Sequence, residues 1–345
     1  MFILGASKFS IFHFPFSVRI IMPSLKEIKN RIASVQSTRK ITSAMKMVAS
    51  SKLHHAQQMI ENMLPYENLL ESILKSFLAA DVDARGALVE SREVKKVSLI
   101  VFASNSSLCG GFNANVLKMM QHTVEDYQAK GIEVSIYPVG RKVAEKVAKL
   151  GIKSEGNFNT LADKPNSADC VKIGQELAEK YVKGETDKVD IIYHHFKSAG
   201  SQILTKKVLY PIDIEEAMNY DHTRDLTHQL ATGDAAEYLE QQGGHKALDG
   251  THSASKAKPL NDNFIVEPDM QTVLNALVPR YVNLMIYTAL LDSNASEHAA
   301  RMVAMQTATD NADELLRILN LQYNKSRQQA ITNELLDIVG GSVNN

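Results

Sequence analysis

The chain has 345 residues, of which 44% are hydrophobic and 22% are charged, and its formal net charge is −1. This length fits one or two domains, and a net charge near zero gives no general attraction to nucleic acid. No run of about twenty apolar residues is present, which argues against a membrane-spanning helix. The two cysteines, Cys109 and Cys170, are far apart in the sequence and predict buried free thiols in a reducing compartment.

Residues 1–22 form an apolar leader that contains serine and no acidic residue. Its composition is compatible with a transit or signal peptide. The clear helical pattern begins only after Met22 and Pro23. We therefore favour an upstream start codon and expect the leader to be disordered or absent in the working protein.

Residues 23–80 are predicted to form one long helix. Its helical pattern spans about fifty residues, which corresponds to a length of about 75 Å at 1.5 Å per residue. Ser24 and Glu27 match a capping box at its start. Apolar residues then recur at steps of three and four, with Thr38 in a gap and Pro65 as a predicted kink. The stripe consists of Leu25, Ile28, Ile32, Val35, Ile41, Met45 and Val48, and it continues to Leu64, Leu70 and Leu74.

The other faces of this helix are basic, because Glu27 is the only acidic residue before Glu61. A solvated surface and a contact with an acidic partner both explain this pattern. Nucleic acid is a third interpretation, which we do not favour because no aromatic residues alternate with the basic ones as stacking platforms. The basic residues are Lys26, Lys29, Arg31, Arg39, Lys40, Lys46 and Lys52.

Strand-like and helix-like segments alternate between residues 94 and 217, which predicts a small α/β domain with a largely parallel sheet. We expect Gly131 and Gly151 to end the first two helices and Ser167 to cap the third. The last two strands are joined by the short sequence SAGSQ and are predicted to form an antiparallel hairpin.

The loop SNSSLCGGFNAN follows the first predicted strand, where many α/β proteins bind nucleotides. Neither a lysine nor a hydroxyl follows its Gly-Gly pair as in a Walker A loop, and the three spaced glycines of a dinucleotide fingerprint are absent. His194 and His195 are consecutive on a predicted strand, so they would point to opposite faces and could not share a metal. We expect no catalytic residue, no metal and no cofactor on this chain.

Residues 218–262 read as a surface insertion, because they are rich in Gly, Asp, His and Thr and lack apolar periodicity. At most, DAAEYLEQQ would form a short helix. The segment holds four histidines whose spacing does not predict a metal site: His222, His228, His245 and His252.

Residues 263–345 are predicted to form a second long helix, with Pro268 in its first turn and Pro279 loosening its first turns. Apolar and small residues follow alternating steps of four and three, which predicts a left-handed coiled-coil seam. The seam is Leu277, Tyr281, Leu284, Thr288, Leu291, Ala295, His298, Met302, Met305, Thr309, Ala312, Leu316, Leu319 and Tyr323. Alanines crowd its middle and would allow a second helix to approach closely.

This second helix would be about 105 Å long at 1.5 Å per residue, longer than the first helix with which we expect it to pair. Its unpaired end would be apolar and would need a socket in another protein. The residues of that end are Ile331, Leu335, Leu336, Ile338 and Val339.

Three stretches closely resemble the gamma subunit of the F-type rotary ATP synthase: KEIKNRIASVQSTRKITSAMKMVASSKL, SLCGGFNAN and SEHAARMVAMQTATDNADELLRILNLQYNKSRQQAITNELLDIVGG. The resemblance covers residues 23–218 and 263–343. It implies an antiparallel coiled coil of the terminal helices beside a Rossmann-like domain. It also implies a non-catalytic rotor, the central stalk, which couples proton flow to ATP synthesis on the beta subunits or runs in reverse.

The implied partners are the alpha and beta subunits of the catalytic hexamer, the epsilon subunit and the c-ring of the membrane sector. Arg327 and Gln328 match the family's Arg-Gln pair, which hydrogen-bonds a beta loop, whereas surface charge explains Lys40 and Lys46 almost as well. The expected contacts between rotor and stator are Lys40, Met45, Lys46, Cys109, Gly110, Arg327, Gln328, Ile331, Leu335 and Ile338.

The chain departs from the family pattern in its leader, in the insertion and at Asn105-Ser106-Ser107, where the family usually has Asp-Arg/Lys-Gly. Any charge contact from those loop positions is therefore in doubt. We expect the protein on the cytoplasmic face of a bacterial inner membrane, held there by its complex, with the matrix side of a mitochondrial membrane as the alternative. Two rival functions are an enzyme built on the α/β domain and a coiled-coil tether that binds nucleic acid through the basic helix.

Overall fold

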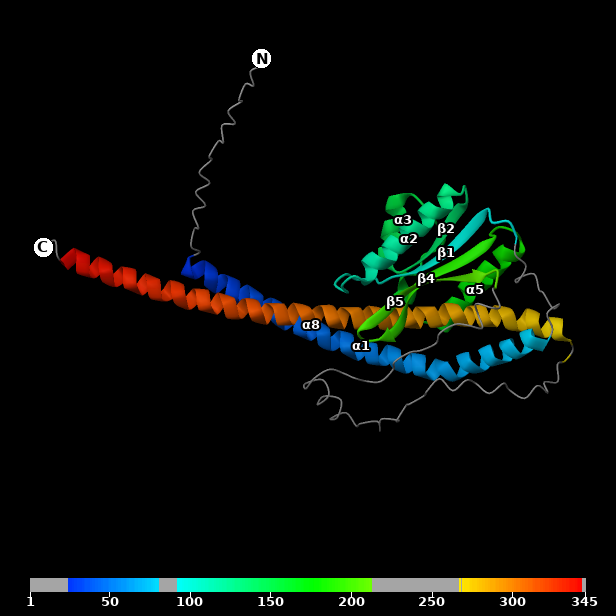
Figure 1. Ribbon diagram of the computed structural model, residues 1–345, viewed down its shortest axis with the longest axis horizontal. Coiled ribbons are helices and arrows are strands. Elements are labelled where there is room, and N and C mark those ends of the chain that lie inside the picture. Colours follow the sequence, from blue (N-terminus) through cyan, green and yellow to red (C-terminus); the bar gives the residue numbers. More distant parts are fainter. Residues whose placement is uncertain (1–23, 81–91, 213–266, 268, 343–345) are drawn as a thin grey trace, which may run out of the picture. The chain divides into compact units, whose positions relative to one another are not determined.

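The computed structural model describes residues 24–80, 92–212, 267 and 269–342. The predicted leader, the insertion with its four histidines, and Pro268 lie outside the described residues. Two long helices, α1 (Leu25–Ala80) and α8 (Met270–Ser342), continue through Pro65 and Pro279 respectively. The chain divides into two compact units, Lys40–Asp310 and the remainder, and each long helix contributes to both (Figure 1).

The unit Lys40–Asp310 contains a sheet of five strands in the order β3-β2-β1-β4-β5. The first four strands pair in parallel, and β5 pairs with β4 in the antiparallel sense. The strands are β1 (Lys96–Phe102), β2 (Glu133–Val139), β3 (Lys153–Ser154), β4 (Lys188–Ser198) and β5 (Ser201–Tyr210). This topology confirms the predicted alternation and the predicted terminal hairpin.

Helices cover both faces of the sheet, which explains why β1 is almost entirely apolar. One face packs on α2 and α3, where Leu99 shares a core with Val116 and Val143. The other face packs on α5 and on α8, where Ile100 and Leu290 belong to a second core. The helices of the domain are α2 (Phe112–Ala129), α3 (Arg141–Leu150), α4 (Asn159–Asp163) and α5 (Ser167–Val182).

Helix ends mostly follow the predicted signals. The Ser24 hydroxyl accepts a hydrogen bond from the Glu27 amide at 3.2 Å, which caps α1. Gly131 and Gly151 adopt the left-handed conformation just after α2 and α3, as predicted. The prediction of Ser167 as a cap is wrong by one residue. Asn166 has the extended backbone of a cap and accepts from the Ala168 amide at 3.0 Å, while Ser167 is already helical.

Within the unit Lys40–Asp310, α1 and α8 run antiparallel. The hydroxyls of Thr42 and Thr309 lie 2.9 Å apart, and Ile60 shares a core with Leu291. The predicted seam of α8 is confirmed here, because its members in this unit are buried or half-buried. Within the other unit, Arg39 pairs with Asp313, and Ile28 and Leu319 are buried.

The predicted stripe on α1 is wrong at Ile41 and Val48, whose side chains are 59% and 57% exposed. The buried positions are instead Thr42 and Ala49. These two residues continue the strict spacing of four and three that starts at Ile28, so the period of the seam outweighs the hydrophobicity of single residues. Small side chains at the seam also let the two helices approach closely.

Gly140 brings the turn after β2 against the end of β1. Its φ is +107°, and a Cβ at this position would lie 2.1 Å from the carbonyl oxygen of Ala103. Only glycine fits such a backbone conformation and such a close approach.

We therefore expect Gly140→Ala to lower the free energy of unfolding by about 3 kcal/mol, since a forced positive φ and a backbone clash act together. Urea unfolding of the purified chain, followed by circular dichroism, measures the loss. Gly200→Ala is the matched control, because Gly200 has open space around its Cα. Equal stability of the two variants would contradict the role assigned to Gly140.

Candidate functional site: the junction of the α/β domain with α8

The loop after β1 is held closed by one side chain. The Asn113 amide oxygen accepts from the Ser104 amide at 3.1 Å. Its nitrogen donates to the Ser104 hydroxyl at 2.7 Å, the Ser106 carbonyl at 3.2 Å and the Cys109 sulfur at 3.1 Å. The backbone turns through left-handed conformations at Leu108 and Gly110. The loop is therefore a compact, self-bonded structure that ends in α2.

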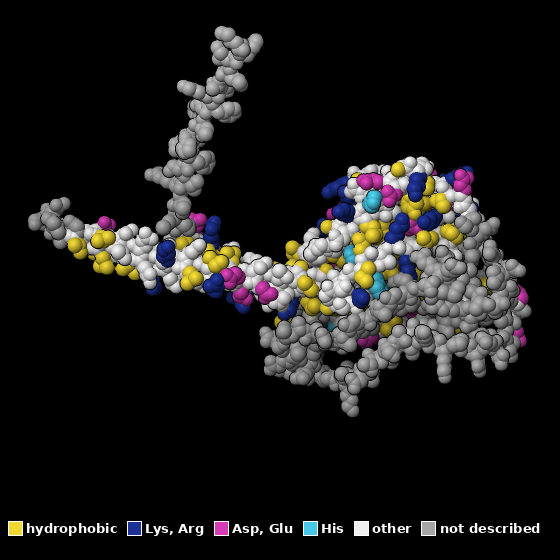
Figure 2. Space-filling view, viewed as in Figure 1, with side chains coloured by type: hydrophobic (Ala, Val, Ile, Leu, Met, Phe, Trp, Pro, Cys, Tyr) yellow, Lys and Arg dark blue, Asp and Glu magenta, His cyan; other side chains and the backbone are white. Residues whose placement is uncertain are grey.

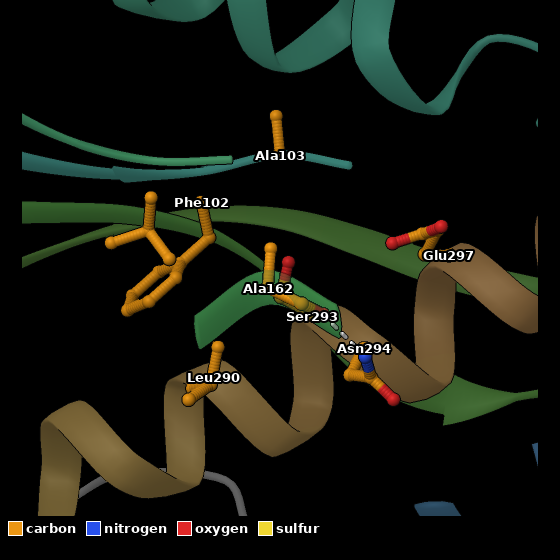
Figure 3. A pocket seen from close by; sticks show the side chains of 8 residues that line it. Phe102, Ala103, Ala162, Leu290, Ser293, Asn294 and Glu297 are labelled. Atoms are coloured by element: carbon orange, nitrogen blue, oxygen red, sulfur yellow. Dashed lines mark hydrogen bonds between the residues drawn. The ribbon is translucent and has the colours of Figure 1, made fainter. Parts of the chain in front are cut away.

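Side chains of α8 fill the place beside this loop where a nucleotide lies in many α/β proteins. Figure 3 shows Leu290 of α8 near Phe102 at the end of β1 and Asn294 of α8 beside Ala162 of α4, and these residues line one cavity together with Ala103 and Glu297. The cavity between them has a volume of about 10 Å³, room for about one water molecule, whereas ligand pockets are typically about 300–1,000 Å³. The space at the junction is therefore filled mainly by packing between α8 and the α/β domain.

Polar residues of α8 form much of this junction, although they are buried. The Asp292 carboxylate lies 2.7 Å from Nδ1 of His195 on β4, and the side chains are 0% and 7% exposed. The Ser296 hydroxyl donates to the His194 carbonyl at 3.3 Å, and the Asn294 amide donates to the Ala162 carbonyl at 2.9 Å. These bonds attach α8 to β4 and α4. The sequence carries one signal for these bonds, the spacing of Asp292 and Ser296 on one helix face, and it does not identify their partners.

The rings of His194 and His195 lie on opposite faces of β4, as predicted. His195 faces α8, whereas His194 stacks on Phe112 of α2 with 4.4 Å between ring centroids. In the part of the chain that the structure describes, no group of three or more His, Cys, Asp or Glu side chains is arranged to hold a metal ion.

Burial shifts the pKa values of several titratable side chains at the junction. It lowers the pKa of His194 to about 4 and that of His298 to about 4, the latter helped by the nearby positive charges of Arg301 and Lys52. Burial also raises the pKa of Glu297, against the opposing effect of Arg301. In each case burial shifts the pKa toward the neutral form because a charge loses its hydration.

Both cysteines are free and buried, as predicted. Burial raises the pKa of the Cys170 thiol to about 12, so this thiol is unreactive near neutral pH. Cys109 is 2% exposed and contacts Asn113 within its own loop.

The residues predicted to contact the stator fall into the two units. In the unit Lys40–Asp310, Lys40 and Gly110 are exposed, whereas Met45 and Lys46 are half-buried and Cys109 is buried. In the other unit, every predicted contact residue is exposed: Arg327, Gln328, Ile331, Leu335 and Ile338. No single site of the described structure joins all of them, and their role stays a prediction.

Asn105 and Ser106, which depart from the family pattern, make hydrogen bonds to other parts of the same chain. Asn105 contacts α3 and α4, and Ser106 accepts a hydrogen bond from Arg301 of α8 at 2.7 Å. Their side chains therefore serve the junction itself. Among the residues described, no helix is long and apolar enough to cross a membrane.

A family model described as ATP synthase matches residues 24–343. Curated relatives named ATP synthase gamma chain agree: that of Bacteroides thetaiotaomicron is 50% identical and that of Phocaeicola vulgatus 48% identical, each over 93% of this chain and 100% of the relative. The chain belongs to the ATP synthase gamma chain family. A more distant relative of the same name, from Flavobacterium johnsoniae, is 38% identical over 93% of this chain and 98% of its own length.

Solved structures share the fold of this gamma chain. A chain of the central stalk and c-ring structure of the Tetrahymena thermophila mitochondrial ATP synthase has a TM-score of 0.51 at 23% identity, over 78% of this chain and 99% of that chain. A chain of the Euglena gracilis mitochondrial ATP synthase rotor has a TM-score of 0.52 at 18% identity, and the match covers 89% of this chain and 98% of that chain. The predicted fold class, an α/β domain with two long terminal helices, is therefore confirmed.

The buried histidines predict acid sensitivity. Because the pKa of His194 and of His298 falls from 6.5 to about 4 on folding, the unfolded chain binds more protons between these values. Stability should therefore be complete above pH 6.5 and fall as the pH drops toward 4. Unfolding midpoints in urea, measured across this range, should show a smaller decline in the double variant His194→Phe, His298→Gln.

His122→Gln is the control for this prediction, because His122 is exposed on α2. An identical pH dependence in the double variant and in this control would show that the buried histidines do not cause the acid sensitivity.

Proposed function

We propose that this gamma chain is the rotating central stalk of a proton-translocating ATP synthase and is itself non-catalytic. Family membership supports the assignment to this enzyme. The observation that carries the rotor role is the C-terminal end of α8. Every residue from 331 to 339 is exposed there, including five large apolar residues. Apolar side chains lie along this end of α8 in Figure 2.

An exposed apolar helix end of this kind requires a partner surface. We place it in a socket formed by the alpha and beta subunits of the catalytic hexamer. Contacts in such a bearing would be mostly apolar and weakly directional, so the helix could turn in its socket without strong bonds holding one orientation. Arg327 and Gln328, exposed on the same helix, would meet polar groups of a beta subunit during rotation.

Close packing of the two long helices supports the role of a shaft. In the unit Lys40–Asp310 the seam contains Ala49, Ala56, Ala295 and Ala299, each at most 2% exposed. Small residues bring two helix backbones near each other, and dense packing resists deformation. The seam would therefore transmit torque between the c-ring and epsilon subunit at one end and the hexamer at the other.

The basic residues of α1 remain compatible with an acidic surface on the beta subunits, since Lys26, Lys29 and Arg31 are exposed. In this proposal ATP forms on the beta subunits, driven by proton flow through the c-ring. The complex would hold the chain on the cytoplasmic face of a bacterial inner membrane; the relatives named above are bacterial proteins.

Reconstitution tests the proposal. The purified chain, mixed with alpha and beta subunits, should restore ATP hydrolysis, and a chain that ends at residue 330 should support less than about half of that rate. The truncation should leave the unfolding midpoint of the isolated chain nearly unchanged, because the side chains of residues 331–339 are all exposed. A folded full-length chain that fails to join the alpha and beta subunits would overturn the proposal.

Arg327→Ala tests the side-chain contact separately. We expect turnover of the reconstituted complex to fall at least about tenfold, the effect of losing one hydrogen bond to a charged group. The free energy of unfolding should change by less than about 0.5 kcal/mol, since the residue is exposed. Arg317→Ala, on the same helix and ion-paired with Glu314, is the control. Equal turnover of both variants would remove Arg327 from the contact set.

A further inference from the structure

Two adjacent loop residues bind different parts of the unit Lys40–Asp310. The Asn105 amide nitrogen donates to the Asn159 carbonyl at 2.6 Å and to the Asp163 carboxylate at 2.7 Å. Its amide oxygen accepts from the Arg141 backbone at 2.8 Å. Asn105 is therefore fixed to α3 and α4, the helices that follow β2 and β3 in the chain.

Ser106 is fixed to α8 instead. Its hydroxyl accepts from one nitrogen of the Arg301 guanidinium at 2.7 Å, and the other nitrogen donates to the Glu297 carboxylate at 2.7 Å. The Arg301 and Glu297 side chains are only 11% and 9% exposed. The Ser106 side chain itself is exposed, so it is Glu297 that holds the guanidinium in place for Ser106. A hydrogen bond from a charged donor is stronger than one between neutral groups.

The same face of α8 receives the rest of the loop. Glu297, Arg301 and Ala304 follow each other at steps of four and three and so share one helix face. Gly110, in a left-handed conformation, brings the loop backbone next to Ala304, with 3.8 Å from its would-be Cβ to the Ala304 Cβ. The loop thus lies along two turns of α8.

A neighbouring face of α8 at this level belongs to the seam with α1. Ala295 and Ala299 pack there in a core with Leu53 and Ala56 of α1. The helix pair is therefore already complete without Arg301. The polar contacts of Arg301 add an attachment between α8 and the loop 104–110, beside the bonds of Asp292, Asn294 and Ser296 that attach α8 to β4 and α4.

We propose that Arg301 is a positioning residue that locks the loop 104–110 to α8 and thereby couples the long-helix pair to the α/β domain. The inference rests on the proposed rotor function, in which torque has to pass between these parts. Apolar packing resists separation but has little directional preference. The Arg301–Ser106 bond has a fixed direction, and Asn105 transmits its restraint to α3 and α4.

The experiment uses the assembled ATP synthase in lipid vesicles, with ATP hydrolysis and ATP-driven proton uptake measured side by side. Arg301→Gln removes the charge, and Ser106→Ala removes its acceptor. In either variant we expect hydrolysis within about twofold of the wild type, while protons taken up per ATP fall at least about twofold. Amides of residues 104–110 should exchange hydrogen about tenfold faster, as expected for the loss of one charge-assisted bond.

Three further variants test whether the effect comes from the Arg301–Ser106 contact. Arg301→Lys keeps the positive charge and should restore part of the proton uptake per ATP. The double variant Ser106→Ala, Arg301→Gln should be no worse than the worse single variant, because both remove the same contact. Arg280→Gln, an exposed arginine on α8 in the same unit, is the control and should behave as the wild type.

The proposal is wrong if Arg301→Gln takes up as many protons per ATP as the wild type. It is also wrong if hydrolysis and proton uptake fall in the same proportion, because that pattern indicates a general structural defect. If Arg301→Gln does not assemble, the Ser106→Ala measurement decides by the same criteria. Failure of the wild-type chain to join the complex would instead overturn the rotor function itself, and it is observed before any variant is compared.

Discussion

The middle of α8 must satisfy two partners at once, and the arrangement of the unit Lys40–Asp310 depends on this constraint. One face packs against α1 through small and apolar residues such as Ala295 and Ala299. Another face packs against the sheet, where Leu290 joins the core of β1 and α5. A helix buried on more than one side cannot show a simple amphipathic stripe, which is why the polar residues of this segment have to be bonded rather than exposed.

This constraint also explains why the crevice at the carboxyl end of β1 is filled by protein. In a doubly wound sheet the carboxyl ends of the strands leave a crevice that a ligand can occupy. Here α8 lies against that end of β1, and the loop after β1 closes on itself through Asn113 and bonds to Arg301. The fold keeps the strand, turn and helix of a phosphate-binding unit but uses them to hold a helix.

Much of the fold could be predicted from the sequence because its signals are local or periodic. The α8 seam follows a spacing that is visible without any tertiary information, and the alternation of strands and helices is marked by Gly131 and Gly151. The error in the α1 stripe has a physical cause. Hydrophobicity alone selects Ile41 and Val48, whereas the helical period of the seam selects Thr42 and Ala49.

The junction could not be predicted in the same way, because its contacts join residues far apart in the sequence. His195 and Asp292 are separated by 97 positions, and Ser106 and Arg301 by 195. Neither pair leaves a local pattern, and each side chain taken alone reads as an ordinary polar residue. The sequence indicated that the loop was unusual at Asn105 and Ser106 but not that these residues bind opposite sides of the junction.

The polar character of the junction has a physical consequence for a shaft. An apolar interface tolerates repacking, since many arrangements of aliphatic side chains have similar free energies. The buried Asp292 carboxylate, which bonds to His195 of β4, and the Arg301 guanidinium, which bonds to Ser106, lose these partners if α8 turns by even part of a helical step. Leaving such a group unpaired away from water costs far more than the pair contributes when intact. The junction therefore favours one angular setting of α8 relative to the sheet, while the alanine-rich seam keeps the two long helices close.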